Sequence, residues 1–254
     1  MTKNIKVDTL QIIIFVTLII LMFSCKKSDN VDEIPIPENN HGVIFNPYLT
    51  YGTVSDIDGN SYKTIVIGTQ TWMAENLRTT KYKNGDLIGT TTPATLNIDG
   101  DSTPKFQWIY NDNINVLDIY GRLYTWYTIT DSRDVCPSGW HIPSDSEWTV
   151  LVNYLGGYTV AGNALKETTN RHWLTLPSNE LPTNSSGFSA VPGGVRFSDG
   201  SFENSIHSGS WWSSDIDTFI TEVAIGRYLV YDTCIVYTEH AFKNMGLSVR
   251  CIKN

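Results

Sequence analysis

The chain has 254 residues and a formal net charge of −8 at pH 7, from 18 basic and 26 acidic residues. It contains no run of Lys and Arg that could neutralise phosphates, so we expect no nucleic-acid partner. Frequent Gly, eight Trp, thirteen Tyr and short apolar runs favour strands and loops, in one domain with a large core or in two small ones.

The start of the chain is typical of an export signal. Lys3 and Lys6 precede an apolar stretch from Leu10 to Phe23. A basic start, an apolar run of this length and a small residue before the cut define a signal peptide, here over residues 1–24. The alternative is an uncleaved N-terminal anchor, for which the run is short, since a membrane span needs about 20 apolar residues.

A lipid attachment site follows directly. Met22-Phe23-Ser24-Cys25 resembles a bacterial lipobox, although Phe23 stands where a smaller residue is usual. The resemblance implies that Cys25 takes a diacylglycerol and becomes the new N-terminus. Each buried methylene then contributes about 0.8 kcal/mol, and two or more chains anchor stably. The expected location is therefore the outer membrane or the cell surface, with the membrane as partner through the lipid.

A tether separates the lipid from the folded domain. We assign residues 25–50 to the lipidated cysteine and this tether, because they are polar and include Pro35 and Pro37, which keep a chain extended. About 20 such residues, at roughly 3.3 Å each, reach up to about 65 Å from the lipid surface.

The folded domain is expected over residues 51–254. Its first part alternates strand-like runs with turns that hold Gly at the tip. The strands are expected at Thr53–Ser55 and Tyr62–Ile67, the turns at Asp56–Asn60 and Gly68–Gln70, and a long surface loop at 85–105.

One main helix is predicted near 145–155. Ser144 can cap it, and Glu147 can reach back to complete a capping box. Four apolar residues recur on one face at helical spacing: Trp148, Leu151, Val152 and Leu155. Gly156-Gly157 can end the helix, and a shorter helical turn is expected at Ala161–Lys166.

The rest of the chain is strand-like. Strands are expected at Gly187–Val191, Val195–Phe197, Trp211–Ser214, Glu222–Leu229, Ile235–Tyr237 and Leu247–Ile252. Several short strands after a helix indicate an α+β domain with an antiparallel sheet.

Seven motifs carry a resemblance to a known family. They are Asp56-Ile57-Asp58-Gly59-Asn60-Ser61-Tyr62, Gly68-Thr69-Gln70-Thr71-Trp72-Met73-Ala74-Glu75-Asn76-Leu77, Tyr120-Gly121-Arg122-Leu123-Tyr124, Cys136-Pro137-Ser138-Gly139-Trp140-His141-Ile142-Pro143, Gly187-Phe188-Ser189-Ala190, Trp211-Trp212-Ser213-Ser214 and Ser248-Val249-Arg250-Cys251. From about Thr53 onward the chain resembles the Fibrobacter succinogenes major paralogous domain. The resemblance implies a C-type-lectin-like single domain, in surface lipoproteins and secreted proteins of Gram-negative bacteria, with no established activity.

The resemblance also implies a disulfide. In lectin-like domains the last strand runs beside the chain that enters the helical region, and a bridge at this place is common. It therefore implies a Cys136–Cys251 disulfide, with Cys234 free. Export to an oxidising compartment lets such a bridge persist.

No catalytic or metal-binding constellation stands out. The histidines are scattered, without the spacing that places two nitrogens on one metal: His41, His141, His172, His207 and His240. His141 is a ligand or base, or, as we favour, a packed histidine bonded to a backbone carbonyl. Cys136 could be a nucleophile, but an exported Cys is more often a disulfide partner. We expect no catalytic residue, metal or cofactor.

Two ligand classes were weighed for the acidic turns and the aromatic residues. Asp56-x-Asp58-Gly59-Asn60 resembles the start of a calcium loop, but Ile67 stands where such a loop needs Glu. We favour a plain turn there and at Asp99-Gly100-Asp101. The segment Trp108–Asp112 only superficially resembles a lectin calcium motif. Stacking of sugars on Trp faces is an alternative, although at least one of Trp211 and Trp212 should be core, and the same caution applies to Trp72, Trp140 and Trp148.

The sequence thus favours a non-catalytic, surface-displayed lipoprotein that acts as a binding or structural module. Its ligand is unknown, with a glycan or a surface protein as candidate partner. One alternative is a carbohydrate-binding lectin-like protein. The other is an enzyme related to formylglycine-generating folds, which use a close pair of reactive cysteines; a low-pKa thiol at Cys234 would favour it.

Overall fold

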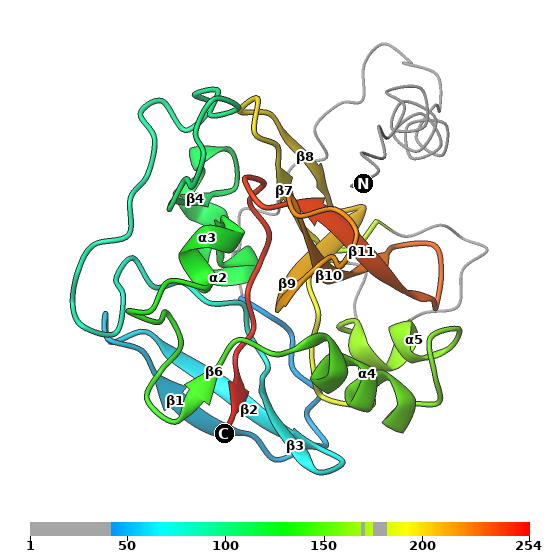
Figure 1. Ribbon diagram of the computed structural model, residues 1–254. Coiled ribbons are helices and arrows are strands. Elements are labelled where there is room, and N and C mark those ends of the chain that lie inside the picture. The colour runs from blue at the N-terminus through cyan, green and yellow to red at the C-terminus, as the bar shows by residue number, and fades with distance from the viewer. Residues whose placement is uncertain (1–41, 169–170, 175–181) are drawn as a thin grey trace, which may run out of the picture. The chain divides into compact units, whose positions relative to one another are not determined.

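The computed structural model describes residues 42–168, 171–174 and 182–254. In this part of the chain the fold is α+β, as expected, with most strands in two curled half-barrel sheets and a few short helices (Figure 1). The expected signal peptide, Cys25 and His41 lie outside the described residues.

The first sheet joins the start and the end of the domain. Its strand order is β1-β2-β3-β12-β6, and all its pairs are antiparallel. The expected turns after β1 and β2 are confirmed, with Gly59 and Gly68 in the left-handed region at φ +85° and +62°. The strands are β1 Gly52–Ser55, β2 Ser61–Ile67, β3 Gln70–Met73, β12 Ile252–Lys253 and β6 Trp140–His141.

The second sheet is built from the later part of the chain. Its order is β11-β10-β9-β7-β8, antiparallel except between β7 and β9. The strands are β7 Gly193–Arg196, β8 Phe202–Ser205, β9 Ser208–Ile216, β10 Val223–Val230 and β11 Val236–Phe242, and a separate pair joins β4 Gln107–Ile109 to β5 Arg122–Tyr124.

The main helix, α4 Asp145–Tyr154, is confirmed together with its signals. Ser144 and Glu147 form the full capping box, and Trp148, Leu151 and Val152 are buried. The other helices are short: η1 Tyr110–Asp112, η2 Ile114–Val116, α2 Leu117–Tyr120, α3 Trp126–Ile129 and α5 Ala161–Leu165. Within the described ranges, no helix has the length and apolar character needed to cross a bilayer.

Two large apolar clusters and a smaller third one, around Val116 and Ile119, fill the described part of the domain, and β9 contributes to both large ones. Trp212 belongs to the cluster with Tyr124 and Leu247, while its neighbour Trp211 belongs to the cluster with Trp72 and Trp148. Consecutive strand residues point to opposite faces, so the Trp-Trp pair places one indole in each large cluster.

The prediction of a strand at Gly187–Val191 is wrong. This segment forms one isolated bridge, between Ala190 and Lys166. Ser189 has a φ of +54°, and its backbone N–H donates to Asn184 Oδ1 at 2.9 Å. Side chains therefore take the hydrogen bonds that a strand partner would take, and they bend the segment.

The prediction of a strand at Leu247–Ile252 is mostly wrong as well, because only Ile252–Lys253 form a strand, β12. The preceding residues instead form a seam, residues 247–251, that bonds to both sheets. On β9, Ser248 donates to the Ser210 carbonyl at 3.0 Å. On the side of the first sheet, the carbonyls of Val249 and Cys251 accept from Leu77 at 2.8 Å and Met73 at 3.0 Å.

Residues 42–50, assigned to the tether from the sequence, pack on the domain. Val43 is buried, and the N–H of Ile44 donates to Glu167 Oε2 at 3.1 Å. Asn46 Nδ2 donates to the Asn184 carbonyl at 3.1 Å. The apolar residues Val43 and Phe45 give this stretch its attachment to the apolar clusters.

Candidate functional site

A buried polar cluster at the centre of the domain, here called the Asn76 hub, joins segments that are far apart in sequence. Asn76 Oδ1 accepts from Trp211 Nε1 and from Arg250 Nε, both at 2.8 Å. Asn76 Nδ2 donates to the Tyr120 carbonyl at 2.9 Å and to Ser248 Oγ at 3.2 Å. The amide of one residue thus ties together four chain segments.

Arg250 carries the charge of the hub. Its side chain is fully buried, and its two terminal nitrogens donate to the carbonyls of Phe188 and of Ser189, the latter at 2.9 Å. The guanidinium lies 4.2 Å from the centroid of the Phe188 ring. Burial lowers the pKa of Arg250 to about 9, so the group stays charged at neutral pH and depends on these acceptors for its solvation.

Five of the seven sequence motifs meet at the hub: those that contain Asn76, Tyr120, Phe188, Trp211 and Arg250. Gly121 shows how tight the packing is, because its φ is +70° and a Cβ there would lie 2.7 Å from Asn76 Cβ. The family motifs therefore serve the interior of the fold.

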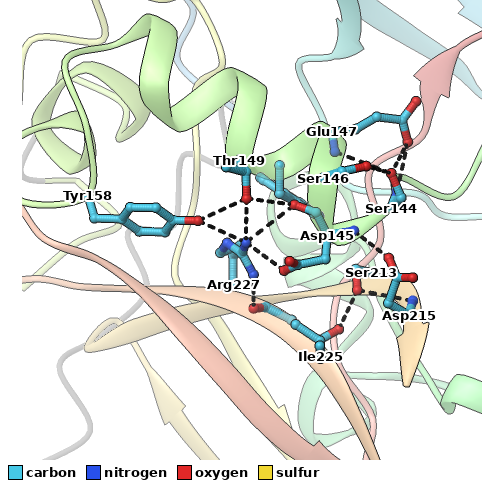
Figure 2. Close-up of polar contacts among 12 residues, drawn as sticks. Ser144, Asp145, Ser146, Glu147, Thr149, Tyr158, Ser213, Asp215, Ile225 and Arg227 are labelled. Atoms are coloured by element: carbon cyan, nitrogen blue, oxygen red, sulfur yellow. Dashed lines mark hydrogen bonds and ion pairs between the residues drawn. The ribbon is translucent and has the colours of Figure 1, made fainter. Parts of the chain in front are cut away.

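A second polar cluster holds α4 on the second sheet (Figure 2). Arg227 of β10 is buried and pairs with Asp145 Oδ1 at 2.6 Å. Figure 2 shows the hydroxyls of Tyr158 and Thr149 directed at the same guanidinium, at 3.1 and 3.3 Å from its Nη2. Asp215 Oδ2 accepts from the N–H of Asp145 at 2.5 Å. These contacts fix the start of the helix to β9 and β10.

Two further buried cations bond mainly to backbone carbonyls. Arg196 donates to the carbonyls of Ala94 and Leu96, at 2.8 and 2.6 Å from Nη2, and so holds the long loop at 85–105. Lys166 Nζ donates to the carbonyls of Val230 and Thr233 at 2.9 and 2.6 Å. Both side chains thus stabilise loops by donating hydrogen bonds to their backbone carbonyls from inside the domain.

Four of the histidines are placed, and they do not converge. His141 contacts Asn254 Oδ1 at 2.7 Å and Glu147 Oε1 at 2.9 Å, so its partners are side chains and not the backbone carbonyl we expected. His172 pairs with the buried Glu167 at 2.6 Å. His207 contacts the Ser205 carbonyl at 3.1 Å, and His240 contacts Asp217 at 2.7 Å.

The expected calcium candidates bond to the protein itself. Asp56 Oδ1 accepts from the N–H groups of Asp58 and Asn60, and its Oδ2 accepts from the Tyr62 hydroxyl. Asp58 Oδ2 accepts from the N–H of Thr80 at 2.6 Å. The carboxylates thus stabilise the turn after β1, as the plain-turn interpretation expects. Asp99 and Asp101 lie in an exposed turn, and across the described ranges no three His, Cys, Asp or Glu side chains gather as a metal site would require.

The tryptophans are interior residues. All eight lie within the described residues; Trp126 is half-buried, and the others are buried: Trp72, Trp108, Trp140, Trp148, Trp173, Trp211 and Trp212. Their faces are therefore not presented for stacking on a sugar ring. Trp108 packs under Arg196, whose guanidinium lies 4.0 Å from the ring centroid.

The predicted disulfide is confirmed. Cys136 and Cys251 are bonded, with Cα atoms 5.9 Å apart and a sequence separation of 115. Cys234 is free and half-buried, and its thiol donates to the Thr159 carbonyl at 3.1 Å.

A shallow depression of about 310 Å³ lies beside α3 in the described part of the surface. Its lining includes Lys105 and Asp131, which form an ion pair at 2.7 Å. Asp131 also pairs with Arg133 at 2.8 Å, and these partners hold its pKa well below the usual range. The charges that line the depression are therefore already neutralised by one another.

Glu239 on β11 is a titratable group that the sequence did not single out. Its Oε2 is buried without a hydrogen-bond partner within the described residues, and burial raises its pKa to about 7. The ionised form is therefore disfavoured in the folded state. The alternation along β11 predicts an inward side chain here, but it does not predict that a carboxyl would occupy that position.

We expect Glu239→Gln to stabilise the protein at pH 8 and not at pH 4. The folded pKa of about 7 exceeds the ordinary 4.5, so the wild type loses stability as the pH rises through this range, by about 3 kcal/mol in all. The glutamine amide does not ionise, so the variant does not lose stability in this way. Denaturant melts of both proteins from pH 4 to pH 8 measure the difference, and parallel pH profiles would contradict the prediction.

The comparison with known proteins yields one family. The Fibrobacter succinogenes major domain matches residues 65–253, a range that contains six of the seven motifs in full. No curated protein and no solved structure matches the chain.

Proposed function

The chain belongs to the Fibrobacter succinogenes major domain family, and from this membership we propose that it is a non-catalytic, surface-displayed lipoprotein that acts as a binding or structural module. The observation that carries the proposal is the use of the family motifs in the Asn76 hub. The motif residues that meet at the hub are buried and join chain segments to one another, so they support the fold and are not presented to a substrate.

The proposed fold relationship is to C-type-lectin-like domains. Its support is the looped α+β architecture with one main helix, and the disulfide between the chain before α4 and the seam. The seven buried tryptophans offer no face on which a sugar could stack, so a glycan would have to stack on exposed rings such as Tyr48, Tyr154 or Phe219. Cys136 and Cys251 are buried and bonded to each other, which disfavours a reactive cysteine pair of the kind that the enzyme alternative requires.

Two experiments test the proposed function: one asks whether the protein is exposed on the cell surface, and the other asks whether it binds a ligand. We expect protease added to intact cells to cleave the protein, and the purified full chain to retain a surface protein or a glycan in pull-down and array screens. A measured turnover on any substrate, with no ligand retained, would replace this proposal by the enzyme alternative.

We expect Cys25→Ser to abolish lipidation. The apolar stretch ends directly before Cys25, and the resemblance to a lipobox makes its thiol the acceptor of the diacylglycerol. Metabolic labelling with a fatty-acid analogue measures the effect, with Cys234→Ser as the matched control that should keep the label. Label that persists in Cys25→Ser would place the anchor elsewhere.

A further inference from the structure

The turn between β9 and β10 presents apolar side chains to solvent. Phe219 is 92% exposed, and Ile220 beside it is 45% exposed. Ile216 at the end of β9 and Phe242 at the end of β11 are also exposed. The register places them at one end of the sheet, since Ile216 pairs with Ala224 and Phe242 with Val223. We call residues 216–222 together with Phe242 the β9–β10 tip.

The tip is held in one conformation by Asp217. Its Oδ1 accepts from the N–H groups of Phe219 and Ile220 at 2.7 and 2.9 Å. The backbone closes the turn from Val223 N–H to the Ile220 carbonyl at 3.0 Å, and from Asp217 N–H to the Val223 carbonyl at 3.1 Å. Phe219 is thus displayed on a turn in which its own N–H and that of Ile220 are already bonded, which lowers the cost of bringing the turn into an apolar medium.

The charged side chains nearest the tip take part in hydrogen bonds. Asp217 Oδ2 contacts His240 at 2.7 Å, and Lys243 Nζ donates to the Thr221 carbonyl at 2.6 Å while lying over the Trp126 ring. Three carboxylates, on Asp215, Asp217 and Glu222, and one ammonium, on Lys243, lie near the tip, so the charge there is negative on balance. A surface that accepts this tip should therefore be apolar inside and carry no strong negative charge.

We propose that the β9–β10 tip inserts into the zwitterionic interface of the membrane that holds the lipid anchor. This inference rests on the proposed lipidation of Cys25. Between Cys25 and Gly42 the chain spans 17 residues, at most about 60 Å when extended. A domain of this size has a radius of gyration of roughly 17 Å, so the tip is within reach of the bilayer, and tethering gives it a high effective concentration there.

The test places a reporter at the tip of the full, lipid-anchored protein. The native tryptophans are buried or half-buried, whereas Phe219→Trp adds an exposed indole. Subtraction of the wild-type fluorescence spectrum from that of the variant gives the signal of this added indole. The matched control is Tyr48→Trp, because Tyr48 is 93% exposed and lies closer along the chain to the lipid. Both variants are reconstituted into phosphatidylcholine vesicles, with and without brominated acyl chains.

We expect a blue-shifted difference spectrum and quenching by brominated lipid for Phe219→Trp, with neither effect for Tyr48→Trp. Equal quenching of both variants, or of neither while the protein floats with the vesicles, would overturn the inference. A concentration-dependent blue shift without lipid would assign the tip to a second copy instead. Protein that does not float with vesicles would refute the lipid anchor itself, and the inference would fall with it.

Discussion

Replacement of Arg250 by Met is expected to destabilise the protein by about 2–5 kcal/mol, because buried acceptors lose their donor. The substitution leaves the carbonyls of Phe188 and Ser189 without their donor, and each buried acceptor costs about 1–3 kcal/mol. Relief of the desolvation of the guanidinium offsets part of this loss. Chemical denaturation at pH 7 measures it.

The matched control is Arg133→Met on the surface. Arg133 pairs with Asp131 and Asp86 but is about one-third exposed, and solvent screens such ion pairs, so we expect little change in stability. Arg250→Lys should behave like Arg250→Met, because one ammonium cannot reproduce the fork that bonds to three acceptors. If Arg250→Met lowers the free energy of unfolding by less than about 1 kcal/mol, the Asn76 hub contributes little to stability.

Removal of the disulfide is expected to cost about 4–5 kcal/mol at most. Cys136 and Cys251 close a loop with a sequence separation of 115, and the chain-entropy model gives about 4.7 kcal/mol for a loop of 100 residues. Structure in the denatured state lowers the figure. The double variant Cys136→Ala, Cys251→Ala is compared with the wild type in guanidinium melts.

Cys234→Ala serves as the control for the disulfide. Its thiol makes one hydrogen bond, to the Thr159 carbonyl, so we expect a change of about 1 kcal/mol or less. An equal loss for Cys234→Ala and the double variant would contradict the assignment of the stabilisation to loop closure.

Local features of the fold could be predicted because their signals lie within a few residues. The capping box at Ser144 and Glu147 and the buried face of α4 follow from spacing alone. The first hairpin follows from the Asp-Gly turn between two β-rich runs. The strands that were missed, β3, β4, β5, β6 and β8, are two to four residues long, which is too short to show a period.

The buried polar clusters could not be predicted in the same way. Arg250 and Asn76 are 174 positions apart, and nothing near either residue names the other as partner. The motifs mark both residues, but a motif does not state whether a residue serves folding or chemistry. The bent segment at Gly187–Val191 was missed for a related reason, since its backbone bonds to the Asn184 side chain instead of to a strand.

The seam, residues 247–251, has a consequence for the order of folding. It lies after nearly every strand in sequence, yet it supplies backbone bonds to β9 and to the chain that follows β3. Contacts of such long sequence separation form slowly. A chain that emerges N-terminus first therefore lacks these backbone bonds between its two sheets until this segment arrives. The domain is completed only when nearly all of its residues are available to fold.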